Sequence, residues 1–224
     1  MSDDVTFHTV EAEAEAEIII KKSKFIGRIV PVQSVAEAEA ELAKIREFHK
    51  AATHNCFAYR VGLGVPIERF SDDGEPSGTA GRPILEVLRR RPVLNALVVV
   101  TRYFGGTLLG ANGLIRAYAD GAAKAIDAAT VLRCLPMQKL AVVCDYSQYG
   151  KLEYALQEDG FSLEDKEYTN KVSFSLWAET GDTEKVLEKV ANLTGGQARM
   201  DAGKPEYVGV RPDGSMVHSV LNQG

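Results

Sequence analysis

The order of segments after Gln138 is the feature that most restricts the fold of this 224-residue chain. An apolar run from Leu140 predicts a strand, and helical spacing that stops at Gly160 predicts a helix after it. Two alternating runs, a second helix ending at Gly195 and a last short strand complete the series. The order β-α-β-β-α-β predicts a ferredoxin-like domain over residues 138–202, with two helices on one antiparallel sheet.

Residues 1–137 precede this pattern and are expected to form a separate domain, so the predicted class is a two-domain α+β protein. Residues 132–137 are interpreted as the connection between the domains, and residues 203–224, which are polar and lack an apolar period, as a mobile tail. The elements expected in the first domain are strands over 11–20 and 25–30, a helix over 35–50, strands over 53–61 and 66–70, a helix over 82–90, a strand over 93–103 and a long helix over 114–126.

Composition narrows the functional classes. The chain has no run of 18 apolar residues, and its N-terminus lacks the basic and apolar regions of a signal peptide, so neither a membrane protein nor an exported one is expected. Its three cysteines are an odd number without a C-x-x-C pair, which is typical of reduced thiols rather than of disulfides or a zinc site. We therefore expect a cytoplasmic protein that holds neither a metal nor a cofactor.

Charge is distributed unevenly along the chain. Residues 18–137 carry 17 Lys and Arg against 11 Asp and Glu, although the net charge of the whole chain is −5. Residues 1–17 and 138–224 are both acidic. A basic segment within an acidic protein favours a polyanionic partner for that segment.

Two glycine-rich loops, residues 71–81 (the first glycine loop) and residues 105–113 (the second glycine loop), each lead into a predicted helix. Free backbone N–H groups and the helix dipole favour anions at such places. Neither loop has the spacing of a nucleotide-binding motif, and glycines that only permit tight turns remain an alternative. The residues expected to contact nucleic acid or another anion are His54, Gly78, Thr79, Gly81, Arg82, Arg102, Tyr103, Gly105, Gly106 and Arg116.

The acidic residues of the first glycine loop allow a different interpretation. Asp72, Asp73 and Glu75, together with His54, could bind a divalent metal or act as acid and base. The alternative is an ordinary turn whose acids favour the following helix start. His54 and Cys56 also suggest a thiol–imidazole dyad, but neighbours two apart on a strand are separated by about 6.6 Å along the backbone.

Four segments resemble the IMPACT family, in its bacterial YigZ-type branch: Ala52–Tyr59, Asp72–Pro83, Val99–Gly106 and Gly113–Tyr118. The resemblance extends from about Ile18 to Ala128, and the second domain is similar to the small C-terminal domain of bacterial members. It implies a first domain with the two-layer α/β fold of the second domain of the fifth small-subunit ribosomal protein. The chain departs from the usual pattern at Thr107-Leu108, where Ile-Lys is common, and loses one lysine that could contact phosphate.

The resemblance also implies a role in translation, because eukaryotic relatives regulate it during amino-acid starvation. Our hypothesis is therefore a non-enzymatic protein that binds RNA, the ribosome or translation factors through its basic first domain. Two alternatives stay open. One is a metal-dependent hydrolase that uses His54, Asp72, Asp73 and Glu75, and the other is a protein-interaction module.

Overall fold

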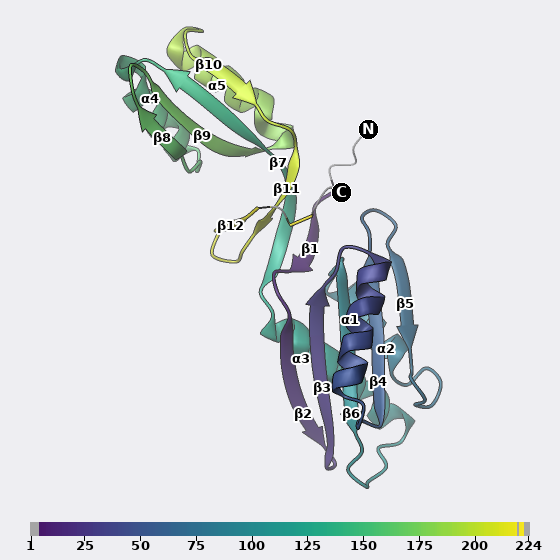
Figure 1. Ribbon diagram of the computed structural model, residues 1–224. Helices are drawn as coiled ribbons and strands as arrows, with labels where there is room; N and C mark the ends of the chain where they lie inside the picture. Colours follow the sequence, from purple (N-terminus) through teal and green to yellow (C-terminus); the bar gives the residue numbers. More distant parts are fainter. Residues whose placement is uncertain (1–4, 219, 222–224) are drawn as a thin grey trace. The chain divides into compact units, whose positions relative to one another are not determined.

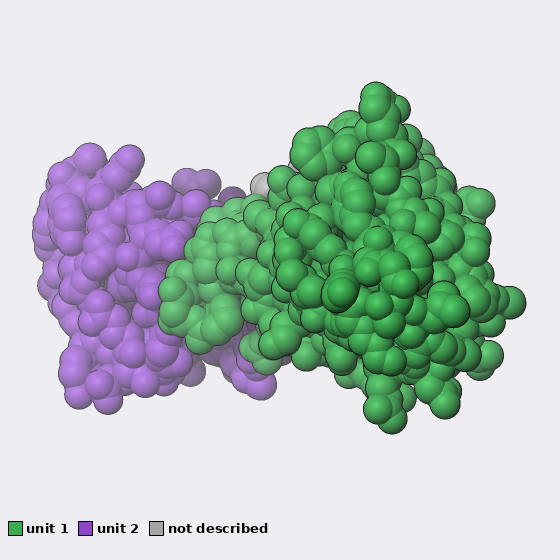
Figure 2. All heavy atoms as spheres, turned by 90° about the horizontal axis from the view of Figure 1, so that it is seen from below, with its two compact units in different colours: residues 1, 3–134, 209–224 green, residues 2, 135–208 purple. Residues whose placement is uncertain are grey.

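The computed structural model describes residues 5–218 and 220–221. These residues divide into two compact units (Figure 2): those up to 134 and from 209 onward form unit 1, and residues 135–208 form unit 2. Both units combine helices with antiparallel strands, so the predicted two-domain α+β class is confirmed. Within the described ranges, no helix has both the length and the apolar character needed to span a membrane.

Unit 1 is built around a five-stranded sheet in the order β2-β3-β6-β4-β5, whose neighbouring strands are all antiparallel. Its β6 strand is apolar along almost its whole length, which is why it takes the central position (Figure 1). The elements of this unit are β2 (Ala14–Ile20), β3 (Ser23–Pro31), α1 (Val35–Phe48), β4 (His54–Val61), β5 (Ile67–Ser71), α2 (Gly81–Arg90), β6 (Ala96–Tyr103) and α3 (Ala111–Ala128).

Helices cover both faces of this sheet. Val98 and Val100 of β6 belong to the core cluster that contains α2 and α3, whereas Leu97 and Val99 belong to the cluster that contains α1. Figure 1 shows α1 on one side of the sheet and α2 and α3 on the other. Unit 1 therefore has one layer more than the two-layer domain that the family resemblance implies, because β6 presents apolar side chains on both faces.

A close contact between two glycines positions α3. A Cβ atom at Gly27 of β3 would lie 2.1 Å from the main-chain oxygen of Gly121 in α3, so only glycine permits this approach. The helix backbone therefore rests directly on the strand, with the beginning of α3 near the loop that follows β6 (Figure 1).

Unit 2 has the predicted order of elements. Its strands lie in the order β10-β7-β9-β8 and are antiparallel, and helices α4 and α5 share one apolar core with β7 and β9. This is the predicted ferredoxin-like arrangement. The elements are β7 (Val131–Cys144), α4 (Tyr146–Glu158), β8 (Glu164–Tyr168), β9 (Val172–Glu179), a short 3₁₀ turn η1 (Thr180–Asp182), α5 (Thr183–Thr194) and β10 (Arg199–Ala202).

Two segments differ from the sequence-based expectation. Residues 132–137 are part of the continuous strand β7, whose first residues pair with a strand that was not predicted, β1 (Phe7–Val10). Residues 203–224 are not simply a tail, since they contain β11 (Glu206–Val210) and β12 (Met216–Val217), and Val208 is buried. An ion pair between Arg211 and Glu11, 200 positions apart, anchors this segment. Residues 219 and 222–224 of the expected tail lie outside the described residues.

Candidate functional site

The two glycine loops of unit 1 meet at one surface hollow of about 400 Å³, which we call the loop hollow. Buried charged side chains form its floor, and apolar side chains of the second glycine loop and α3 form its wall. The residues that line it are Thr53, His54, Gly74, Glu75, Pro76, Arg102, Phe104, Leu108, Leu109, Gly110, Ala111 and Leu114.

Asp72 organises the first glycine loop. Its Oδ2 accepts the N–H of Gly78 at 2.8 Å, and its Oδ1 accepts the N–H groups of Ala80 at 3.0 Å and Gly81 at 2.8 Å. A Cβ at Gly81 would lie 2.6 Å from the backbone of Ser71, so this glycine permits close packing of two backbone segments. The N-terminus of α2 is thus already occupied by a carboxylate of its own chain.

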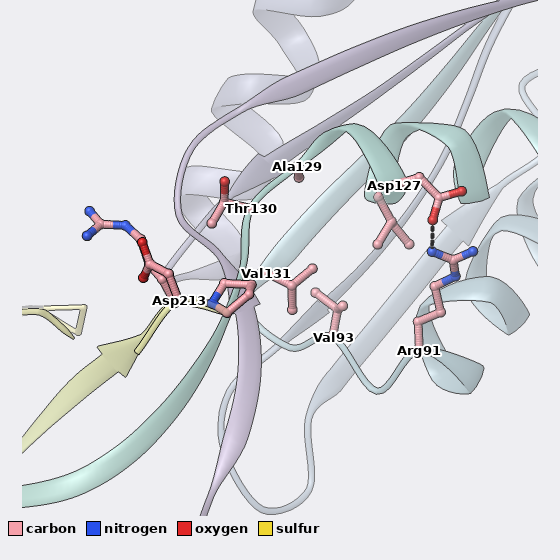
Figure 3. A pocket seen from close by; sticks show the side chains of 10 residues that line it. Arg91, Val93, Asp127, Ala129, Thr130, Val131 and Asp213 are labelled. Atoms are coloured by element: carbon pink, nitrogen blue, oxygen red, sulfur yellow. Dashed lines mark hydrogen bonds and ion pairs between the residues drawn. The ribbon is translucent and has the colours of Figure 1, made fainter. Parts of the chain in front are cut away.

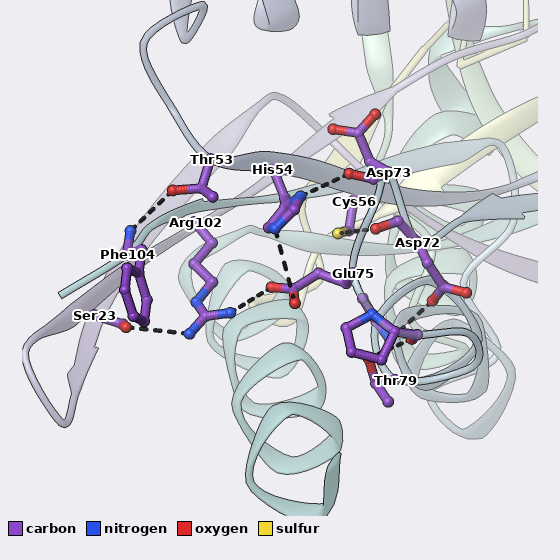
Figure 4. Close-up of polar contacts among 12 residues, drawn as sticks. Ser23, Thr53, His54, Cys56, Asp72, Asp73, Glu75, Thr79, Arg102 and Phe104 are labelled. Atoms are coloured by element: carbon purple, nitrogen blue, oxygen red, sulfur yellow. Dashed lines mark hydrogen bonds and ion pairs between the residues drawn. The ribbon is translucent and has the colours of Figure 1, made fainter. Parts of the chain in front are cut away.

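The carboxylate of Asp73 also serves the local structure. Its Oδ2 accepts the N–H of Asn55 at 2.6 Å, and its Oδ1 lies 3.1 Å from Nη2 of Arg46. Figure 4 shows the carboxylates of Asp72 and Asp73 directed away from Glu75, so the three acids do not converge as the hydrolase hypothesis requires. Among the residues that the structure describes, no group of three or more His, Cys, Asp or Glu side chains could hold a metal ion.

Glu75 is the acid that points inward, and its side chain is only 4% exposed. Its Oε1 accepts hydrogen bonds from Nη1 of Arg102 and from the hydroxyl of Tyr118, both at 2.7 Å. The guanidinium of Arg102 also lies 5.4 Å from the ring centroids of Phe25 and Phe104. A buried ion pair with aromatic cover therefore forms the floor of the loop hollow (Figure 4).

His54 lies beside this pair. Its Nδ1 is 2.7 Å from the main-chain oxygen of Asp73, and because a carbonyl oxygen only accepts, Nδ1 carries the hydrogen. Its Nε2 lies 3.9 Å from Oε2 of Glu75, beyond hydrogen-bond distance. The backbone thus holds the ring with Nε2 directed toward Glu75 (Figure 4).

Cys56 has no role as a nucleophile in this geometry. Its thiol donates to the main-chain oxygen of Asp72 at 3.0 Å, and burial raises the pKa of the thiol far above its ordinary value. Burial likewise raises the pKa of Tyr118, with smaller contributions from Cys56 and Glu75. A thiol that stays protonated does not support the His54–Cys56 dyad.

The second glycine loop packs against the turn between β2 and β3. The N–H of Gly105 donates to Oγ of Ser23 at 3.1 Å, and a Cβ at Gly105 would lie 2.0 Å from the carbonyl carbon of Lys22. Lys21 and Lys22 in that turn are exposed, with φ angles of 46° and 67°. These lysines are not among the residues predicted for anion binding, because more than 80 positions separate them from Gly105 in the sequence.

Replacing Gly105 by alanine is expected to lower the free energy of unfolding by about 1–3 kcal/mol, because the new methyl group overlaps the Lys22 backbone. Chemical denaturation of the two proteins measures the difference. Gly150→Ala is the matched control, since the structure leaves open space at that position. Equal free energies of unfolding for the Gly105 variant and the native protein would show that Gly105 does not pack closely against the Lys22 backbone.

The other residues predicted for anion binding lie apart from the loop hollow. Arg82 and Gly78 line a separate groove of about 320 Å³ between α2 and α3, and Arg116 is exposed on α3. The Tyr103 hydroxyl lies 3.0 Å from Nδ1 of His49, and the Thr79 hydroxyl donates to the main-chain oxygen of Pro76 at 2.6 Å. The structure therefore brings together His54 and Arg102 but distributes the remaining predicted contacts over unit 1.

Gly106, like Gly78, is a predicted anion-binding glycine whose surroundings are open. Its φ angle is 81°, and a Cβ there would meet no atom within 4 Å. Gly110, whose φ angle is 73°, is the N-cap residue of α3, and it makes no side-chain capping bond. The beginning of α3, unlike that of α2, thus retains free backbone N–H groups.

A larger hollow of about 610 Å³ lies near the end of α3 (Figure 3). Its lining includes Arg91, Asp127 and Arg211, but Arg91 pairs with Asp127 and Arg211 pairs with Glu11. None of the residues predicted for binding lines this hollow. Its charged side chains, Asp213 with Ser215 included, already have partners in the chain, so the loop hollow is the better candidate site.

Comparison with protein-family models identifies the Impact N-terminal domain over residues 21–126 and a domain of unknown function (DUF1949) over residues 142–197. The chain is 39% identical over 203 residues to the IMPACT family member YvyE of Bacillus subtilis, covering 91% of this chain and 94% of that protein. It is 32% identical over 183 residues to the IMPACT family member YigZ of Escherichia coli, covering 81% and 90%.

Similarity to Protein IMPACT of Rattus norvegicus is confined to a shorter stretch, with 36% identity over 100 residues, 42% of this chain and 31% of that protein. Among solved structures, a crystal structure of a hypothetical protein matches with a TM-score of 0.57 and 30% identity, covering 87% of this chain and 96% of that chain. Family models for both domains and full-length bacterial relatives agree, and the chain belongs to the IMPACT family.

Proposed function

We propose that this protein regulates translation by binding RNA phosphate through unit 1. The observation that carries the proposal is the contact of the Lys21–Lys22 turn with the second glycine loop, where α3 begins without a side-chain cap. The turn between β2 and β3 and the loop between β6 and α3 lie at the same end of unit 1 (Figure 1). Lysine ammonium groups and free backbone N–H groups both bind phosphate oxygens.

The charge of unit 1 supports this proposal. Most of its Lys and Arg side chains pair with acids, as Arg28 does with Glu15 and Arg69 does with Glu39. Within the part of the chain that the structure describes, the exposed cations of unit 1 without an ion pair are Lys21, Lys22, Arg82, Arg90, Arg116 and Lys124. Unpaired surface cations gain free energy on binding phosphate, because counterions are released from the nucleic acid.

The Lys22 backbone also contacts the loop in which the family resemblance leads us to expect a lysine. Leu108 stands where many family members have lysine, which removes one cation from the second glycine loop. Lys22 is a cation of the turn that packs against that loop. The first glycine loop contributes less, because the carboxylate of Asp72 already occupies the N-terminus of α2.

A double variant, Lys21→Gln with Lys22→Gln, tests the proposal. We expect its affinity for a fluorescein-labelled RNA hairpin to fall roughly tenfold at about 50 mM NaCl. The slope of log K against log salt should decrease in magnitude by about 2, since each lysine that contacts phosphate contributes about 1. Fluorescence anisotropy over a salt series measures both quantities.

The matched control removes one lysine in α1 and one just after the end of that helix, which lies on the opposite face of the sheet from α3. Lys44 and Lys50 pair with Glu41 and Glu47, and Lys44→Gln with Lys50→Gln makes the same change in net charge. RNA affinity should stay within about twofold of the native value in this variant. Absence of measurable RNA binding by the native protein, or an equal loss in both double variants, would contradict the proposal.

A further inference from the structure

We propose that the loop hollow binds a guanine base, with the phosphate of the same nucleotide at the N-terminus of α3. The proposal deepens the proposed function. It rests on that function where the guanine is an unpaired base of bound RNA. A free guanine nucleotide offers the same chemistry. His54 and Glu75 supply the acceptor atoms that would bind the base.

Two hydrogen-bond acceptors face each other on the floor of the hollow. Nδ1–H of His54 donates to the Asp73 carbonyl, so in this tautomer Nε2 is the ring nitrogen that accepts. Oε1 of Glu75 accepts both Arg102 and Tyr118, whereas Oε2 accepts no hydrogen bond from the described residues. These two acceptors are 3.9 Å apart and open to the hollow, so both can accept hydrogen bonds from the donors of one guest molecule.

The floor of the hollow carries an ion pair without net charge, so it favours an uncharged guest group. Glu75 and Arg102 neutralise each other, and their side chains are 4% and 6% exposed. A guest ammonium would therefore add an uncompensated positive charge to a poorly solvated site. Ring N–H and amino N–H groups of a nucleobase are donors without that charge.

Guanine is the RNA base whose pairing edge matches two neighbouring acceptors. It carries N1–H beside the amino group on C2, so it offers two adjacent donors on that edge. Adenine and cytosine each place a ring lone pair beside their amino group, and uracil has one N–H between two carbonyl oxygens. Those bases would direct at least one acceptor toward Glu75 or His54, which leaves buried groups unpaired.

The walls of the hollow fit a flat ring. Phe104 is 47% exposed, and the Arg102 guanidinium lies 5.4 Å from its centroid. Leu108, Leu109 and Leu114 add apolar surface, and Leu108 is 82% exposed at the mouth. Exposed aromatic rings and neighbouring apolar side chains stack unpaired bases in RNA-binding proteins.

The beginning of α3 supplies the group for phosphate. Gly110 and Ala111 line the hollow, and the N-terminus of this 18-residue helix has no side-chain cap. Its first N–H groups therefore remain available to an anion. The same hollow thus offers acceptors to the base and donors to the phosphate of one nucleotide.

Titration calorimetry with GMP, IMP and AMP tests the base preference. IMP has N1–H but lacks the amino group on C2, so it removes a single donor from the guest. We expect GMP to bind roughly tenfold tighter than IMP and AMP, because one lost hydrogen bond to a buried acceptor changes affinity by about that factor. Equal affinities for the three nucleotides, or no detectable binding of GMP, would overturn the proposal.

Two variants test the position of the site. His54→Leu removes Nε2 but keeps the Glu75–Arg102 pair, and it should reduce the difference between GMP and IMP to about twofold or less. Leu108→Ala removes an exposed wall residue, and we expect it to weaken GMP binding about threefold with an unchanged melting temperature. Ile67→Ala, at a 60% exposed position on β5, is the matched control and should bind GMP as the native protein does.

Single-stranded RNA distinguishes the two sources of the base. Oligonucleotides that differ only by guanine or inosine at one position should differ roughly tenfold in affinity if the base belongs to RNA. If only free GMP shows the preference, the guanine site stands with a free nucleotide as its ligand. Salt-dependent RNA binding without preference, in free nucleotides or in RNA, would overturn the guanine site and leave the proposed function intact.

Discussion

Replacing Arg102 by methionine is expected to lower the free energy of unfolding by about 3–5 kcal/mol. The substitution leaves the carboxylate of Glu75, only 4% exposed, without its cation. Oε1 would keep the hydroxyl of Tyr118 as a partner, but one neutral donor does not offset the cost of burying a charge. Urea denaturation at neutral pH, followed by circular dichroism, measures the loss.

A second substitution distinguishes the cost of burying an unpaired charge from the cost of losing the packing of the Arg102 side chain. Arg102→Met combined with Glu75→Gln buries no charge, and the Gln side chain can still accept from Tyr118. We expect this double variant to recover about 2 kcal/mol relative to Arg102→Met alone. Arg91→Met, which breaks the exposed pair with Asp127, should be far milder. A double variant no more stable than Arg102→Met would refute the assigned role of the pair.

Replacing Asp72 by alanine is expected to lower the free energy of unfolding by about 2–4 kcal/mol. The carboxylate accepts from the N–H groups of Gly78, Ala80 and Gly81, so its removal leaves three backbone donors at the start of α2 without partners. Asp72→Asn should fall between the alanine variant and the native protein, because it retains one acceptor oxygen. Denaturation gives the magnitude, and hydrogen exchange locates the effect at these amides.

Asp182 provides the matched control for this prediction. It also precedes a helix, α5, but makes no side-chain capping bond to the backbone. Asp182→Ala should therefore have a much smaller effect than Asp72→Ala. Similar losses in the two variants would mean that helix-dipole charge, rather than the three hydrogen bonds, accounts for the role of Asp72.

The predicted elements depend on local patterns, and most of them are present. A helix over 35–50 was predicted, and at its observed start the Ser34 hydroxyl accepts the Glu37 N–H at 3.1 Å. Tyr118 lies within the predicted helix over 114–126 and is fully buried on its apolar face. Helix starts and apolar faces involve residues within a few positions of one another, so periodicity and capping residues predict them.

Local sequence patterns predict strand pairing less well than they predict helices. The four residues of β1 are too few for a periodic signal, and they are ordered by pairing with β7 more than 120 positions later. The strands within 203–224 are similarly weak in sequence, and Arg211 finds its partner in Glu11. Contacts between distant segments decide both cases.

The sequence by itself determined the order of the main helices and strands from β2 to β10, the ferredoxin-like domain and the presence of two glycine loops, because each depends on neighbouring residues. Only the tertiary structure decided what the loop acids do. Left-handed backbone at Asp73 and Gly74, with φ of 45° and 88°, turns Glu75 inward while Asp72 caps α2. Arg102 then meets Glu75 across 27 positions. The direction of a side chain depends on backbone angles and distant partners, which the local pattern of residue types does not encode.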